Sequence, residues 1–143
     1  MLVLNGPNLG RLGRRQPEIY GTTTHQQLTE LCEEWGRGLG LDVVVRQTNH
    51  EGELLDWLNA AADTGTPVVL NAAAWTHYSY ALFDACAQLE APLVEVHISD
   101  PASRPEVFRH HSVVTAYAVE VIAGRGLDGY RLALETVAAT EIA

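Results

Sequence analysis

Residues 1–21 read MLVLNGPNLGRLGRRQPEIYG and join a short apolar run to an unusually polar loop. The run 1–4 predicts a buried strand. The loop after it contains two asparagines, three arginines and one tyrosine among its glycines and prolines. A phenol titrates near pH 10, and a nearby guanidinium favours its deprotonated form. Arg15, five positions before Tyr20, is therefore a candidate to turn this tyrosine into a base.

Beyond this stretch, apolar runs alternate with segments of helical periodicity. The expected strands after the first are 43–45, 67–70, 93–98 and 117–122. The expected helices follow a capping box at Thr24 and Gln27, cover 54–62, cover 81–89 after a cap at Thr76, and run from about 127 to 137. Alternation of this kind implies parallel strands joined by helical crossovers. The prediction is a single α/β domain over residues 1–143, with a flavodoxin-like open five-stranded parallel sheet and helices on both faces.

The composition restricts the classes of function. A hydrophobic content of 47% in 143 residues fits one globular domain, and a net charge of −9 argues against nucleic acid or an anionic membrane as partner. The chain contains no lysine, which excludes Schiff-base catalysis and a P-loop. Cys32 and Cys86 lack metal or redox spacing and predict free thiols in a reducing compartment. With no signal peptide and no membrane-length apolar run, we expect a soluble cytoplasmic protein.

Polar side chains gather where the expected strands end. They are Asn5 and Asn8 after the first strand, Asn49 and His50 after the second, Asn71 after the third, and Glu95, His97 and Ser99 at the end of the fourth. Ligands of open parallel sheets bind at these carboxyl ends, so convergence there favours a binding site over ordinary capping.

Glu95 and His97 lie two positions apart on one strand and share a face. A carboxylate in that place can orient the imidazole as a general acid. A purely structural Glu–His pair is the competing interpretation and has equal weight on these two residues alone.

Two loops contain further candidates. The segment 71–77 offers free N–H groups to an oxyanion, and Asn71 and His77 can bind hydroxyls, although a capping residue and a surface histidine explain them equally. The triplet 109–111 can bind an anion or polyol, or can be a solvated charged turn. Asp84 falls on an exposed helix face, where an aspartate is usually inert. The histidines lack zinc-ligand spacing and no GxGxxG motif is present, so neither a metal nor a dinucleotide is expected.

Five segments in order carry a resemblance to a known family: LNGPNLGRLG with the following PEIYG, QTNHEGELLDWL, NAAAWTHYS, EVHIS and FRHHS. Over about residues 2–138 the chain resembles the type II 3-dehydroquinate dehydratases. The resemblance implies a flavodoxin-like dodecamer built from trimers that dehydrates 3-dehydroquinate to 3-dehydroshikimate without metal or organic cofactor. The reaction is an anti elimination through an enolate, in aromatic biosynthesis by the shikimate pathway or in quinate breakdown.

The resemblance also implies roles for matched residues in the elimination. Tyr20 is the base that removes the C2 proton, and Arg15, rather than Arg14, lies on a mobile lid and favours the deprotonated tyrosine. Asn8 holds a water against the enolate oxygen.

On the acid side the resemblance implies that His97, oriented by Glu95, protonates the departing C1 hydroxyl. The other matched residues are implied to bind substrate: Asn71, His77 and Arg109 its hydroxyls, Ile98 and Ser99 its carboxylate, and Asp84 the site of a neighbouring subunit.

The chain departs from the family pattern at a few positions. Phe83 replaces the usual arginine before Asp84, Asp100 replaces an asparagine, the loop 100–107 is about one residue longer, and Ala73–Ala74 stands where one glycine is common. These changes leave every catalytic group in place but bear on affinity and assembly. They support the alternative of a flavodoxin-like anionic-metabolite binding module with a repurposed site. A purely structural oligomer would not need the retained Tyr20, Arg15, Glu95 and His97.

Overall fold

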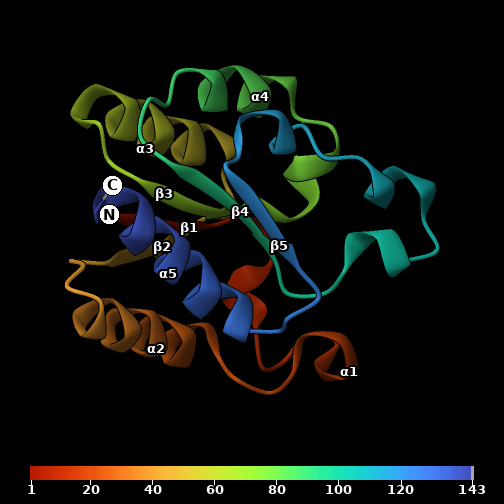
Figure 1. The fold of residues 1–143 in the computed structure, drawn as a ribbon. Coiled ribbons are helices and arrows are strands. Elements are labelled where there is room, and N and C mark those ends of the chain that lie inside the picture. Colours follow the sequence, from red (N-terminus) through yellow and green to blue (C-terminus); the bar gives the residue numbers. More distant parts are fainter. Residues whose placement is uncertain (143) are drawn as a thin grey trace.

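The computed structural model describes residues 1–142 and contains one open sheet of five parallel strands (Figure 1). The strands are β1 (Leu2–Asn5), β2 (Val44–Gln47), β3 (Val68–Asn71), β4 (Leu93–His97) and β5 (Glu120–Ala123). Their order in the sheet is β2-β1-β3-β4-β5. The predicted open parallel sheet is confirmed.

Two pairs of helices cover the two faces of the sheet, as Figure 1 shows. One face carries α2 (His25–Gly38) and α5 (Asp128–Ile142), and the other carries α3 (Glu51–Thr64) and α4 (Tyr80–Ala87). A fifth helix, α1 (Pro17–Tyr20), lies in the long loop after β1. No helix in residues 1–142 is long and apolar enough to cross a bilayer.

The alternation of side chains along the buried strands builds two separate cores. Val3 and Val69 pack with Leu28 of α2 and Leu134 of α5, whereas the neighbouring strand residues point to the opposite core. That second core contains Leu4 and Leu70 from the sheet with Leu54, Leu58 and Leu82 from α3 and α4. A strand buried on both faces reads as a continuous apolar run, which is why these strands are visible in the sequence.

The start of α2 follows from its sequence, but the start of α4 was predicted wrongly. The capping box is present, with Thr24 accepting from the Gln27 N–H and the Gln27 side chain accepting from the Thr24 N–H. Thr76 does not cap α4, because it is buried in a 3₁₀ helix, Ala73–His77. Ser79 caps α4 instead, accepting from the Leu82 N–H at 3.0 Å.

The fifth strand also begins later than predicted. Tyr117 belongs to a 3₁₀ turn, Thr115–Tyr117, and β5 begins at Glu120. The ring of Tyr117 packs against Phe83 at 5.0 Å between centroids. Apolar residues alone did not distinguish this packed turn from a strand.

The strand order creates a switch point beside β1, because the chain leaves β1 for β2 on one side and reaches β3 on the other. Ligands bind at such points, outside the carboxyl ends of the strands. The exit loops of β1 and β3 approach closely here: a Cβ on Gly6 would lie 2.6 Å from the Ala72 carbonyl oxygen. Glycine at this position allows the two loops to meet.

Candidate active site

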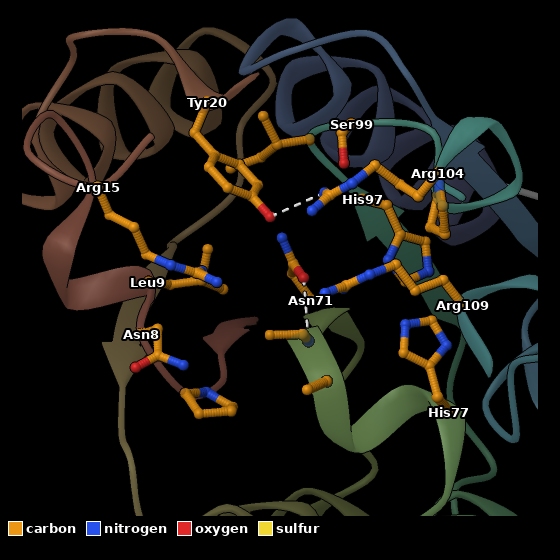
Figure 2. Close-up of a pocket in the computed structure, with 15 residues that line it drawn as sticks. Asn8, Leu9, Arg15, Tyr20, Asn71, His77, His97, Ser99, Arg104 and Arg109 are labelled. Carbon is orange, nitrogen blue, oxygen red and sulfur yellow. Dashed lines mark hydrogen bonds between the residues drawn. The ribbon is translucent and has the colours of Figure 1, made fainter. Parts of the chain in front are cut away.

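A pocket opens at the carboxyl ends of β1, β3 and β4 (Figure 2). Its walls include Asn8, Arg15 and Tyr20 from the loop after β1, Asn71, Ala73 and His77 from β3 and its exit, and His97, Ile98, Ser99, Arg104 and Arg109 from β4 and the loop after it. The structure thus brings together segments spread over a hundred positions of the sequence.

The residues that follow β2 do not line this pocket. Asn49 instead supports a wall residue, since its Oδ1 accepts the backbone N–H of Asn8 at 2.9 Å. His50 is the residue before α3. A polar side chain at a strand end can therefore support the site by holding a residue that lines it, without lining the pocket itself.

Tyr20 lies on one side of the pocket between two arginines. The Arg104 Nη1 donates to the Tyr20 hydroxyl at 3.2 Å, and the Arg15 guanidinium carbon lies 5.4 Å from the centre of the ring. Figure 2 shows Tyr20 and Arg15 on one side of the cavity, with Asn71 between them and the histidines. The structure thus places two guanidinium groups beside this one phenol.

Arg104 is the site residue that sequence reasoning missed. The prediction gave Arg15 the role of the cation beside Tyr20, but in the structure Arg104 makes the direct hydrogen bond across 84 positions. Its place in a second arginine-bearing polar loop was the available signal. The loop holds it through its backbone, because the His110 Nε2 donates to the Arg104 carbonyl at 2.8 Å.

Glu95 and His97 form a buried pair on the opposite side. Glu95 is 1% exposed, and one of its oxygens accepts from the His97 Nε2. Ser112 donates to the same oxygen at 2.8 Å, and Thr115 donates to the other oxygen at 2.6 Å. The pairing through Nε2 leaves Nδ1 as the His97 nitrogen that can meet a substrate.

The carboxylate of Glu95 stays ionised despite its burial. Burial by itself raises its pKa, but the hydrogen bonds from His97, Thr115 and Ser112 outweigh that effect and hold the pKa below its ordinary value. The His97 ring therefore lies against a fixed negative charge. The arrangement suits a general acid.

The backbone around the pocket adopts left-handed conformations at non-glycine residues. The φ angles are 69° at Asn8, 41° at Gln16 and 51° at Ala73. The Ala73 N–H donates to the Asn71 Oδ1 at 3.2 Å. Strained residues of this kind concentrate at functional sites, and all three lie in or next to the pocket wall.

His77 and Arg109 close the pocket on the side of the long loop. The His77 Nδ1 donates to the His111 carbonyl at 2.7 Å, which leaves Nε2 as an acceptor. Burial lowers the pKa of His77 against the effect of that hydrogen bond. Arg109 pairs with Glu106 at 3.1 Å and keeps further N–H groups for a ligand. Of the triplet 109–111, Arg109 alone lines the pocket.

Asp84 and Asp100 lie outside this pocket. Asp84 is on the exposed side of α4, as predicted, and does not reach the cavity of its own chain. Asp100 accepts from the Ala102 N–H at 3.0 Å and so caps a turn. Within residues 1–142, no three His, Cys, Asp or Glu side chains are grouped as metal ligands.

Comparison with known proteins gives a consistent result. Residues 1–138 match the family model described as dehydroquinase class II. A relative from Salinispora tropica named 3-dehydroquinate dehydratase is 67% identical over 137 residues, covering 96% of this chain and 95% of its own.

Solved structures agree. The crystal structure of a type II dehydroquinase from Propionibacterium acnes superposes with a TM-score of 0.94 at 60% identity, covering 97% of this chain and 95% of that one. A type II dehydroquinase from Butyrivibrio crossotus gives 0.91 at 40% identity, covering 95% and 94%.

Proposed function

The chain belongs to the class II dehydroquinase family, and we propose that it is the hydro-lyase that converts 3-dehydroquinate to 3-dehydroshikimate in the shikimate pathway. The observation that carries this proposal is the placement of a phenol between two arginines on one side of a single pocket and a Glu–His pair on the other. An elimination needs this combination of a base and an acid around one substrate.

The proposed reaction is an anti elimination in two steps. The deprotonated Tyr20 takes the proton from C2, and the electron pair moves onto the neighbouring carbonyl to give an enolate. The enolate then re-forms the carbonyl, a double bond forms between C1 and C2, and the C1–O bond breaks. The departing hydroxyl takes a proton from His97 and leaves as water.

Charge on each side of the pocket supports this division of roles. Arg15 and Arg104 place positive charge beside Tyr20, the proposed base, while the ionised Glu95 places negative charge against His97, the proposed acid. Asn8, which lines the pocket and whose backbone N–H donates to Asn49, is proposed to hold a water at the enolate oxygen.

The remaining wall residues are proposed to bind the substrate. Asn71, His77 and Arg109 offer hydrogen-bonding groups to its hydroxyls, and Ile98 and Ser99 offer backbone N–H groups and a side-chain hydroxyl to its carboxylate. Three arginines in one pocket also make a local cationic site in a chain of net charge −9, which suits an anionic substrate.

We further propose that the enzyme assembles as a dodecamer of trimers in the cytoplasm. Asp84, exposed and remote from the pocket of its own chain, would then reach the site of a neighbouring subunit.

The test is a direct assay of the purified protein with 3-dehydroquinate, followed by the ultraviolet absorbance of the conjugated product. A chelator and prior borohydride treatment should both leave the rate unchanged. A folded protein that binds 3-dehydroquinate without converting it would refute the enzyme and favour a metabolite-binding module.

A further inference from the structure

A buried chain of hydrogen bonds runs from the pocket wall through the sheet to α2. The Asn71 Nδ2 donates to the Tyr130 hydroxyl at 3.0 Å, which donates to the Asn5 Oδ1 at 2.7 Å. The Asn5 Nδ2 lies 3.1 Å from the His25 Nε2. These hydrogen bonds thus join β3, α5, β1 and α2. Of the four residues, Asn71 alone lines the pocket.

The hydroxyl of Tyr130 has no evident purpose other than these hydrogen bonds to Asn71 and Asn5. Tyr130 is 0% exposed and packs in an apolar cluster with Leu28, Val69 and Leu134. A phenylalanine would fill the same space without a polar group that needs partners. Burial raises the pKa of Tyr130 above its usual range, so the hydroxyl keeps its proton and remains a donor.

The single proton of that hydroxyl determines the direction of the neighbouring bonds. It goes to the Asn5 Oδ1, so the Tyr130 oxygen can only accept from Asn71. The Asn71 amide must therefore turn its nitrogen toward Tyr130. At its other end the Asn71 Oδ1 accepts the Ala73 N–H at 3.2 Å, which fixes the same orientation.

The hydrogen bond between Asn5 and His25, at the end farthest from the pocket, agrees with this donor and acceptor order. Because Asn5 turns its oxygen to Tyr130, its amide nitrogen faces His25, whose Nε2 must accept. Only a neutral histidine can do so. Burial lowers the pKa of His25 and favours the neutral form.

From this geometry we propose that Tyr130 is a positioning residue for the dehydration. It fixes the Asn71 amide so that the second N–H of Nδ2 is presented to a substrate hydroxyl. The inference rests on the proposed function, because it assigns Tyr130 a part in binding that substrate. Tyr130 itself does not touch the pocket and acts through Asn71.

The first experiment compares the steady-state kinetics of Tyr130→Phe with those of the wild type. The variant loses the neutral hydrogen bond that orients the Asn71 amide. This loss should lower kcat/KM about tenfold, mainly through a higher KM. Tyr117→Phe removes a partly exposed hydroxyl outside the pocket and should leave both constants unchanged. Unchanged kinetics in folded Tyr130→Phe would contradict the proposal.

A double-mutant cycle separates positioning from general stability. In an Asn71→Ala background, Tyr130→Phe should change kcat/KM less than about twofold, although it should still lower the melting temperature. An equal fold loss in both backgrounds would show that Tyr130 acts on the enzyme as a whole. That result would overturn the inference.

A crystal structure of Tyr130→Phe tests the same point without using activity. The Asn71 amide should be rotated or displaced, and an Asn71 in its original orientation would refute the proposal. If that variant fails to fold, Asn5→Ala provides the same test, because Tyr130 then loses its acceptor and can turn its proton toward Asn71. Absence of turnover in the wild type would instead refute the proposed function, and the structural readout would still decide the role of Tyr130.

Discussion

The two sides of the pocket are built in opposite ways. His97 ends β4, in which every residue is buried, and its partner Glu95 accepts three hydrogen bonds. Tyr20 ends α1, a helix of four residues with no buried member, and its hydroxyl is held by Arg104 from another loop. The proposed acid is thus part of the sheet, whereas the proposed base is carried by a short helix with no buried residue.

This difference predicts different local stabilities for the two groups. Segments with few buried apolar contacts open at low cost in free energy, and strands in a core do not. We therefore expect the segment with Tyr20 and Arg15 to open more readily than the strand that ends at His97. Three predictions test this contrast.

The largest effect on turnover should come from removing either proposed catalytic group, and only one of the two changes should lower the stability of the fold. Tyr20→Phe should reduce kcat by at least about 10³-fold, and His97→Ala by about 10²–10⁴-fold. The melting temperature should stay close to the wild-type value in Tyr20→Phe, because its hydroxyl lies at a half-exposed site. His97→Ala should lose about 1–3 kcal/mol of stability, because buried Glu95 loses a partner. Equal stability losses in the two variants, measured at one protein concentration, would contradict the contrast.

A smaller effect, on the free energy of unfolding, should follow from removing one hydrogen bond to Glu95. Thr115→Val removes the donor to the second oxygen of Glu95 and should cost about 1–3 kcal/mol in urea unfolding. Thr136→Val is the matched control, since its hydroxyl donates to the exposed Glu120. A comparable cost in the control would mean that burial of the Glu95 site adds nothing.

The smallest effect is a dependence of stability on pH that comes from the half-buried His25 and His77 and from the buried Glu95. The folded pKa values of His25 and His77 lie below 6.5, so the unfolded chain binds protons first and stability falls as the pH drops from 6.5 through those values. Glu95 stabilises the fold above its ordinary pKa of 4.5, and this contribution is lost as the pH falls through its lower folded value. Urea unfolding across this range should show both losses.

A variant of Glu95 tests whether this residue causes the loss of stability below pH 4.5. Glu95→Gln should reduce the loss below 4.5, because glutamine does not titrate, and a smaller loss should remain because the pKa values of Glu106 and Asp128 are also lowered in the fold. A profile that Glu95→Gln does not alter would exclude Glu95 as its origin.

Much of this protein was determined by its sequence taken alone. The apolar runs and helical periods predicted the parallel α/β sheet, because each strand and helix buries a face of its own. The polar ends of β1, β3 and β4 indicated where a pocket would form, since parallel strands bring their carboxyl ends to one edge. The pairing of Glu95 with His97 followed from their spacing of two residues on a strand.

Only the tertiary structure decided which distant side chains meet. Arg104 reaches Tyr20 across 84 positions, and Tyr130 reaches Asn5 across 125. Ser79 rather than Thr76 caps α4, because Thr76 is buried within the 3₁₀ helix Ala73–His77. Periodicity and capping are local properties of a few neighbouring residues, whereas these contacts depend on how loops and helices pack around the finished sheet.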